Sequence, residues 1–380
     1  MRKIHIIVKN FLTDDERVLS VGGIQSYISE LSRLLFDNGY AINIYQFSRT
    51  NFTQEYQNTT VFGIQTDHIR KWSKKKKAVV EFCLRYFDNN SDLLLFSCDS
   101  LITKNTVKNS IAIQHGISWD VIRDKTANFF YGFLYSYLKA YKRIRNYKYV
   151  NKIVSVDYNF LNWIRAALPM RKYDIVVIPN AFLTNNNEDY GPEEKDMKKI
   201  KIIFARRFVP LRGTRLMANV VLKMLKEFNH IEITFAGEGP DEIYLKRTFE
   251  NYENVHFIKF DQSETLRIHS SHHVAVVPSI GSEGTSLSLI EAMYAKCAVV
   301  ATNVGGITNI IINGYNGILI DPEESQLYWA LIKLVESKKL RDKLSQKAYD
   351  TVCESFSAKR WNDSWLEVMN KFFKDEGKDW

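Results

Sequence analysis

The strongest constraint on the fold is a repeated pattern of short apolar segments separated by longer amphipathic stretches. The segments are rich in β-branched residues, which is typical of strands in a parallel sheet buried on both faces, and the stretches between them have the length of helices. The first series is Ile4 to Val8, Ile42 to Phe47, Leu93 to Phe96, Ile111 to Gln114, Ile153 to Val156 and Ile175 to Ile178. The second series is Ile202 to Phe204, Ile231 to Ala236, Val255 to Phe260, Val274 to Pro278, Ala298 to Ala301 and Gly317 to Ile320.

A polar segment, Asn180 to Lys201, separates the two series and has no apolar periodicity, which indicates a linker. A chain of 380 residues also exceeds the size at which one hydrophobic core usually keeps growing. We therefore predict an α/β fold with two Rossmann-like, doubly wound domains, residues 1–185 and 198–355, whose strand ends face a central cleft. The Trp- and Phe-rich helical stretch 358–380 is predicted to pack back on the first domain.

Composition excludes several classes of protein. No apolar run approaches the ~18 residues that span a bilayer, and the short apolar run at the N-terminus is followed by acidic residues, as in a first strand rather than a signal peptide. The four cysteines form no CxxC pair, which argues against a zinc site or disulfide framework and favours a cytoplasmic location. The net charge of +9 favours anionic partners, namely nucleotide diphosphates, anionic lipid or nucleic acid.

The segment Pro278 to Gly317 is the most informative for function. A strand ends at its start, a Gly- and Ser-containing loop follows, and a helix is predicted to begin near Thr285 or Ser286. The N–H groups and dipole of such a helix end suit a diphosphate. Glu283 precedes the helix and Glu291 lies about two turns later, so the two carboxylates can contact different parts of one extended ligand.

Two further segments follow predicted strands. In Phe204 to Gly213 (FARRFVPLRG), two cations at a strand end can neutralise a leaving diphosphate. Phe235 to Asp241 (FAGEGPD) is a glycine turn that lacks the third glycine of a dinucleotide fingerprint. A nicotinamide-dependent enzyme would need that complete fingerprint, so this alternative is not favoured.

The sequences EGTSLSLIEAM and VVATNVGGI resemble, in register, the Glu-x7-Glu region of family 4 retaining glycosyltransferases, which have the GT-B fold. The resemblance implies that Glu283 contacts the donor sugar near its anomeric centre and that Glu291 binds the ribose hydroxyls. The family pattern G-R-L-x-x-x-K-G aligns Arg207 with its Arg and Arg212 with its Lys, which implies that both bind the diphosphate. Arg206 stands where glycine is usual and adds bulk and charge.

The same resemblance implies the remaining site residues. His115 is expected beside the donor sugar, contacting a hydroxyl, although one histidine at a strand end is often only structural. Asp120 and Asp157 are weaker candidates for acceptor contacts. The residues expected to bind the donor or its nucleotide are Gly22, Gly23, Gly237, Gly239, Ile258, Gly284, Thr285, Ser286, Leu287 and Glu291. Lys259 stands where the family commonly has glycine, so the base is not defined.

The expected reaction is transfer of a sugar from a nucleotide-diphosphate sugar to a hydroxyl of a glycan or lipid-linked acceptor, with retention, in bacterial envelope polysaccharide synthesis. No Asp-x-Asp pair occurs, so no metal or other cofactor is expected. Basic, aromatic stretches at Lys71 to Phe87 and Asn128 to Lys152 indicate either a solvated helix face or contact with an anionic membrane, and no nucleic-acid motif accompanies them. The expected location is the cytoplasm, including the inner face of the plasma membrane. The alternative function is a catalytically silent sugar-nucleotide-binding subunit.

Overall fold

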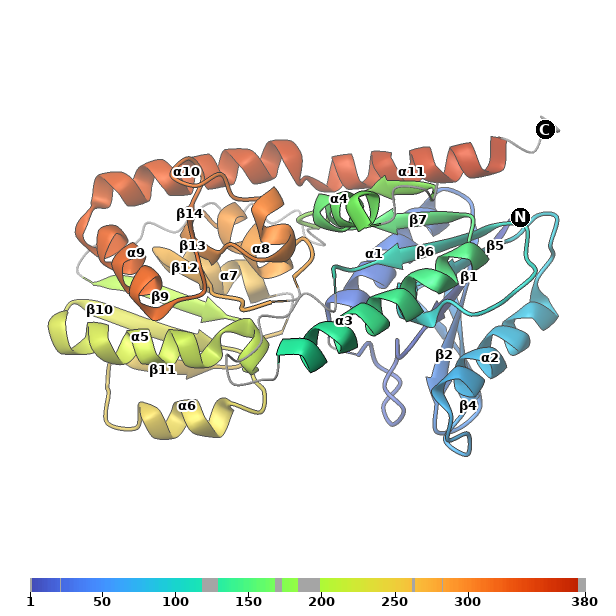
Figure 1. Cartoon of the computed structure of the whole chain (residues 1–380), viewed down its shortest axis with the longest axis horizontal. Helices are drawn as coiled ribbons and strands as arrows, with labels where there is room; N and C mark the ends of the chain where they lie inside the picture. The colour runs from blue at the N-terminus through green and yellow to red at the C-terminus, as the bar shows by residue number, and fades with distance from the viewer. Residues whose placement is uncertain are drawn as a thin grey trace.

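The computed structural model describes residues 2–20, 22–117, 129–167, 173–183, 199–261, 264–281 and 283–374. Two α/β domains lie side by side, and one pair of helices at the C-terminal end of the chain runs along both of them (Figure 1). The linker predicted from the polar composition lies mostly outside the described residues.

The first domain is built on an eight-stranded sheet with the order β3-β4-β2-β1-β5-β6-β7-β8. All neighbouring strands are parallel except β3 and β4, which are antiparallel. The strands are β1 (Lys3–Val8), β2 (Ala41–Ser48), β3 (Phe52–Tyr56), β4 (Thr59–Gln65), β5 (Leu93–Phe96), β6 (Ser110–Gln114), β7 (Lys152–Ser155) and β8 (Ile175–Val177). The helices are α1 (Gly23–Asp37), α2 (Trp72–Cys83), α3 (Phe129–Ile144) and α4 (Tyr158–Ala167), with short 3-10 turns η1 (Leu84–Tyr86), η2 (Asp99–Leu101) and η3 (Arg145–Tyr149).

The second domain has a six-stranded, fully parallel sheet with the order β11-β10-β9-β12-β13-β14. Its strands are β9 (Ile200–Ala205), β10 (Ile231–Ala236), β11 (Val255–Ile258), β12 (Val274–Val277), β13 (Ala298–Thr302) and β14 (Ile318–Ile320). Its helices are α5 (Thr214–Glu227), α6 (Glu242–Thr248), α7 (Thr265–Ser270), α8 (Leu287–Tyr294), α9 (Glu324–Glu336) and α10 (Lys338–Ser355), with 3-10 turns η4 (Pro210–Arg212) and η6 (Gly305–Asn309).

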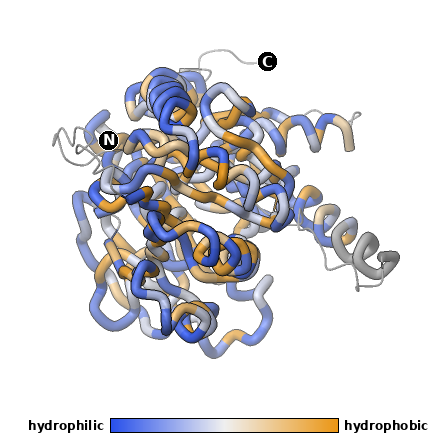
Figure 2. The backbone as a smooth tube through the Cα atoms, turned by 90° about the vertical axis from the view of Figure 1, so that its left-hand side faces the viewer, coloured by the Kyte–Doolittle hydropathy of each residue, from blue (hydrophilic) through white to orange (hydrophobic). Residues whose placement is uncertain are grey.

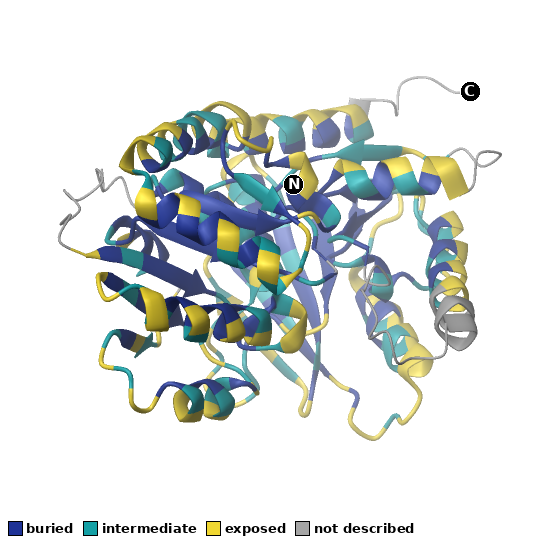
Figure 3. Ribbon diagram, turned by 60° about the vertical axis from the view of Figure 1, so that its left-hand side comes forward, coloured by how far each residue is buried: buried dark blue, intermediate teal, exposed yellow. Residues whose placement is uncertain are grey.

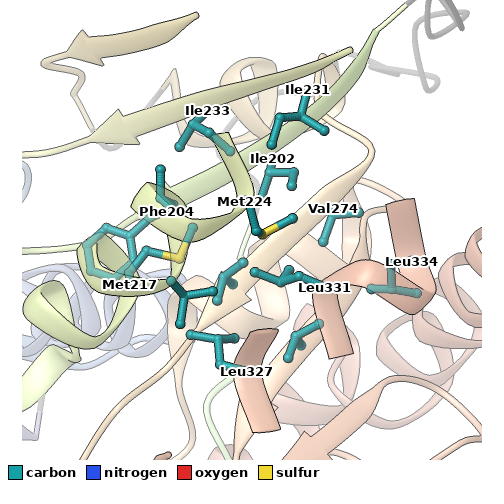
Figure 4. Close-up of a cluster of buried hydrophobic side chains, with 14 of the residues drawn as sticks. Ile202, Phe204, Met217, Met224, Ile231, Ile233, Val274, Leu327, Leu331 and Leu334 are labelled. Atoms are coloured by element: carbon teal, nitrogen blue, oxygen red, sulfur yellow. The ribbon is translucent and has the colours of Figure 1, made fainter. Parts of the chain in front are cut away.

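Both sheets are covered by helices on both faces, which explains the continuous apolar runs in the sequence. In β9, Phe204 packs with the α5 and α9 side chains, whereas Ile203 faces the α7 and α8 side of the sheet. Figure 4 shows the first of these cores, in which Met217 of α5 lies beside Phe204 and Leu331 of α9 belongs to the same cluster. The strands are buried along most of their length, while the helices alternate between buried and exposed residues (Figure 3), in parallel with their hydropathy (Figure 2).

The last helix, α11 (Ala358–Lys374), packs on the first domain although it follows the second in sequence. Trp361 and Trp365 are buried in the first-domain core, and the Trp365 indole N–H donates to the Tyr27 hydroxyl at 2.9 Å. The chain crosses between domains where the Phe182 N–H donates to the Phe356 carbonyl at 2.9 Å. The two crossing segments therefore lie next to each other.

Each predicted apolar run coincides with a strand of one of the two sheets. The antiparallel edge formed by β3 and β4 was not predicted. The edge strand β3 includes exposed polar side chains, and the inner strand β4 (TTVFGIQ) has polar residues at both ends, so neither contains an apolar run like those by which the other strands were found.

Candidate active site

The site forms where loops follow neighbouring parallel strands. Strands β9 and β12 are adjacent, so the loops that leave their carboxyl ends lie side by side. Arg206 follows the last residue of β9, and Ser279 and Glu283 lie in the loop between β12 and α8. Strand order, rather than sequence distance, brings these three side chains together.

Glu283 is the centre of a buried polar cluster. Its Oε1 accepts hydrogen bonds from the Arg206 guanidinium and from the Ser279 hydroxyl, the latter at 2.8 Å. Arg206 also donates to Ser279 Oγ at 2.5 Å, which closes a triangle of three hydrogen bonds. The second carboxylate oxygen, Oε2, lies 2.6 Å from Nη1 of Arg212. One carboxylate is thus held by two arginines.

The charges in the cluster perturb one another. Burial alone would raise the pKa of Glu283, but the positive charges of Arg206 and Arg212 outweigh it and hold the pKa below its usual value. Burial lowers the pKa of Arg206, and the charge of Glu283 opposes that shift. Glu283 is consequently ionised at neutral pH.

The turn at η4 places Arg212 against Glu283. Gly213 follows Arg212 with φ +76°, and a Cβ at this position would lie 1.8 Å from the Pro278 carbonyl oxygen. The Ile280 N–H also donates to the Leu211 carbonyl at 3.1 Å. Only glycine permits this close packing of the η4 turn on the loop after β12.

The two cations of the cluster are not the pair that the sequence pattern assigned. Arg212 contacts Glu283, whereas Arg207 is exposed and no ion pair with Glu283 is described for it. Arg206, which stands where the family usually has glycine, contacts Glu283 instead. The contact between Arg206 and Glu283 could not be predicted from the sequence, because it depends on β9 lying next to β12.

Gly237 and Gly239 pack against protein backbone. A Cβ on Gly237 would lie 2.3 Å from the Arg206 carbonyl oxygen, and one on Gly239 would lie 2.5 Å from that of Phe208. The Phe208 N–H donates to the Glu238 carbonyl at 2.8 Å. These glycines, predicted to bind the donor, therefore fix the backbone that carries Arg206. Ile258 ends β11 beside them, where its carbonyl accepts from the Gly237 N–H at 2.9 Å.

Glu291 lies on α8 and is partly buried. Desolvation raises its pKa to about 7, and the positive charge of Arg206 only partly counteracts this. Within the part of the chain that the structure describes, no hydrogen bond or ion pair to its carboxyl group is recorded. Burial raises the pKa of both carboxyl groups. Two contacting arginines reverse this effect at Glu283, whereas at Glu291 the pKa stays raised.

The loop that carries Glu283 also forms the contact between the domains. A Cβ on Gly116, where φ is +97°, would lie 2.7 Å from the Gly284 nitrogen. Thr285 donates through its hydroxyl to the Val156 carbonyl, and its own carbonyl accepts from the Asn180 side-chain amide at 2.6 Å. The predicted donor-binding residues Gly284 and Thr285 are thus held by the first domain.

His115 lies at this contact, with its backbone carbonyl close to Gly284. Its Nε2 is 2.9 Å from the Ser97 carbonyl oxygen, which can only accept, so Nε2 carries the proton and Nδ1 is an acceptor. Burial lowers the pKa of His115 to about 4. The imidazole is therefore neutral at neutral pH and can accept a hydrogen bond from a hydroxyl.

The start of α8 meets the glycine loop of the first domain. Ser286 is the N-cap residue of α8, and its Oγ lies 3.3 Å from Ser288 Oγ. The position of a Cβ on Gly23 is 3.6 Å from Leu287, the first residue of α8, and Gly22 immediately precedes α1. The structure thus brings these predicted residues together across the domain boundary.

Two weaker candidates remain, and Asp157 lies near the domain contact, where a Cβ on Gly306 would lie 3.0 Å from the Asp157 Cβ. Asp120 lies outside the described residues. Asp157 is buried, and its Oδ1 accepts from the Phe160 N–H at 2.8 Å at the start of α4, a helix-capping contact. Among the described residues, no group of three or more His, Cys, Asp or Glu side chains is arranged to hold a metal ion. Nor does any described helix have the length and apolar character to cross a membrane.

Comparison with known proteins relates the chain to glycosyltransferases. Residues 185–351 match the family described as glycosyl transferases group 1. An uncharacterized glycosyltransferase of Methanocaldococcus jannaschii is 26% identical over 76% of this chain and 73% of that protein. The poly(ribitol-phosphate) alpha-N-acetylglucosaminyltransferase of Staphylococcus aureus is 25% identical over 59% of this chain, and the match spans only 47% of that relative.

Solved structures define the fold. Sucrose-phosphate synthase from Thermosynechococcus elongatus has a TM-score of 0.78 at 15% identity, covering 98% of this chain and all of that one. TarM of S. aureus, in a complex that contains UDP, has a TM-score of 0.72 at 15% identity over 97% of this chain and all of that one. The protein therefore has the GT-B fold, as predicted. The match over residues 185–351 and the similar relatives relate it to glycosyltransferases.

Proposed function

We propose that the protein is a retaining glycosyltransferase that uses a nucleotide-diphosphate sugar as its donor. The observation that carries this proposal is an ionised carboxylate, Glu283, held by two arginines beside the N-terminus of α8 at the contact between two Rossmann-like domains. Helix N-termini and arginines both stabilise phosphate oxygens. A solved relative of the same fold was crystallised with UDP.

Each part of the donor then has a complementary group. The diphosphate lies at the start of α8 near Arg212, which is the more exposed arginine, and Arg212 stabilises the charge that develops as the diphosphate leaves. Glu291 accepts hydrogen bonds from the ribose, and Glu283 lies beside the sugar. His115 accepts a hydrogen bond from a sugar hydroxyl through Nδ1. No metal ion is needed in this arrangement, because the arginines and the helix end supply the positive charge.

The acceptor hydroxyl attacks from the face that the diphosphate leaves, so the anomeric configuration is retained. The bond from the anomeric carbon to the diphosphate breaks as the bond to the acceptor oxygen forms, and the leaving phosphate takes the acceptor proton. This front-face course uses Glu283 to position the sugar.

A donor screen tests the proposal. Hydrolysis and thermal stabilisation are measured with UDP-, GDP- and dTDP-sugars, and the anomeric configuration of any product is read by NMR. We expect one base to be preferred and the product to retain its configuration. Glu283→Gln should lower kcat by at least about 100-fold with little loss of donor binding. An inverted product, or wild-type turnover by the variant, would contradict the mechanism. Donor binding without transfer would instead favour the silent-subunit alternative.

We propose further that α3 brings the protein to an anionic membrane surface, where a lipid-linked acceptor for envelope polysaccharide would be found. Tyr137, Leu138 and Tyr141 of α3 are exposed, and Lys142 and Arg145 are exposed next to them. Aromatic residues with adjacent cations suit the headgroup region of an anionic bilayer.

The structure shows which cations to change in a test of membrane binding. Arg143 pairs with the buried Asp99 at 2.6 Å, and Lys76 donates to backbone carbonyls, so both are left intact. The variant Lys142→Gln/Arg145→Gln should lose sedimentation with vesicles of phosphatidylglycerol and phosphatidylcholine. The matched control Lys339→Gln/Lys343→Gln, on exposed positions of α10, should keep it. Equal binding by both variants would disprove the role of α3.

A further inference from the structure

The two arginines that contact Glu283 are not equivalent. The Arg206 side chain is 6% exposed, and its guanidinium donates both to Ser279 and to Glu283. The Arg212 side chain is 31% exposed and approaches the other carboxylate oxygen from the η4 turn. Arg206 is therefore enclosed within the cluster, whereas Arg212 is accessible from solvent.

Because two arginines contact Glu283, one of them can move away without leaving the carboxylate unpaired. Two guanidinium groups, those of Arg206 and Arg212, contact the single ionised carboxylate of Glu283. If Arg212 were the only counter-ion, moving it to a ligand would leave a buried carboxylate unpaired, which is strongly unfavourable. With Arg206 in place, Glu283 keeps a partner when Arg212 moves.

We propose that Arg206 is a positioning residue that neutralises and orients Glu283 permanently, so that Arg212 can leave Glu283 and bind the phosphates of the donor. This inference rests on the proposed function of the same site. The backbone supports the role, because Gly237 packs on the Arg206 carbonyl and the Arg206 N–H donates to the Ala236 carbonyl at 2.9 Å. Arg206 thus lies on a fixed part of the chain.

Binding of UDP and of inorganic pyrophosphate, measured by calorimetry, tests the release of Arg212. In Arg206→Ala, Glu283 retains Arg212, so both ligands should bind at least about tenfold more weakly. The double variant Arg206→Ala/Glu283→Ala removes the contact between Glu283 and Arg212, and binding should recover. If Arg206 contacted the phosphates itself, the double variant would remain weak, and that result would overturn the proposal. The control Arg267→Ala removes an arginine that is 60% exposed and should leave binding unchanged.

Arg206→Lys separates positioning from binding. Lysine keeps the charge but cannot donate to Ser279 and Glu283 through a planar fork. UDP affinity should stay within about threefold of wild type while kcat falls, because Glu283 loses its orientation. A variant with unchanged kcat, or one that loses affinity as Arg206→Ala does, would contradict the assignment.

A stability measurement is independent of any donor. Arg206→Ala should lower the thermal midpoint of the wild type, but not that of Glu283→Gln, in which Arg206 has lost its ionised partner. Equal lowering in both backgrounds would refute the coupling of Arg206 to Glu283. If the wild type binds neither UDP, GDP nor dTDP, the proposed function fails, and this comparison still decides whether Arg206 acts on Glu283.

Discussion

Glu291 offers a prediction in which stability and function change in opposite directions. Its carboxyl group lies on α8 with a pKa raised by desolvation to about 7, against a reference value of 4.5. Replacing it by glutamine keeps the shape and removes the charge. We expect Glu291→Gln to stabilise the protein at alkaline pH and to weaken nucleotide binding there.

The magnitude follows from the pKa. Between pH 4.5 and 7, the folded protein keeps a proton on Glu291 that the unfolded chain has released, so the free energy of unfolding falls as pH rises through this window. A shift of 7 minus 4.5, at about 1.4 kcal/mol per pKa unit, gives an upper limit of about 3.5 kcal/mol above pH 7. Glutamine does not titrate, so Glu291→Gln does not lose this free energy of unfolding. The variant should therefore be no more stable than the wild type at pH 4.5, and its excess stability should be largest at pH 8.

Thermal midpoints of wild type and variant at pH 4.5, 6 and 8 provide the assay. Comparing the two proteins at each pH cancels the titration of all groups that they share. Glu354→Gln, an exposed change on α10, serves as the control and should show no pH-dependent difference. The reasoning is refuted if Glu291→Gln is destabilising at pH 8, or if its effect is the same at pH 4.5 and pH 8.

Nucleotide binding completes the test. If ribose hydroxyls donate to the ionised carboxylate, losing that charge-assisted contact should weaken UDP binding at pH 8 by about 10- to 100-fold. The difference between the proteins should shrink below pH 7, where the wild-type carboxyl is protonated. Greater stability with unchanged UDP affinity would support the desolvation of Glu291 and reject its ribose contact.

Three other predictions concern packing. Gly116→Ala places a Cβ 2.7 Å from the Gly284 nitrogen, so sugar transfer should fall at least about tenfold; wild-type rates would show that the domain contact is not needed. Gly213→Ala places a Cβ 1.8 Å from the Pro278 carbonyl oxygen and should cost about 2 kcal/mol or more in unfolding free energy, which urea denaturation measures. Trp365→Ala should cost about 3 to 5 kcal/mol by the same measurement, and a loss under 1 kcal/mol would contradict its core role.

The fold was predictable because strands buried on both faces require continuous apolar runs, and these are visible in one sequence. The hairpin of β3 and β4 was missed because one of its strands is an edge strand with exposed side chains. Glu283, Glu291 and Arg212 were predicted as site residues from their match to the family's sequence pattern. Arg206 was assigned only bulk and charge, because its partner depends on β9 being adjacent to β12, and a single sequence does not contain strand order.

The glycines show a second limit of the sequence. Gly237 and Gly239 were expected to bind the donor, and the structure shows that their missing side chains also leave room for the backbone of the chain after β9. Both roles require glycine for the same steric reason, so the motif cannot separate them.

The loop after β12 combines two functions that are often separate in a two-domain protein. Glu283 is bound by arginines of the second domain, and Thr285, two residues later, is bonded to Val156 and Asn180 of the first domain and its crossing segment. A change in the angle between the domains must therefore strain or move the chain next to Glu283. The segment from Glu283 to Thr285 therefore links the Arg206 contact in the second domain to the Val156 contact in the first.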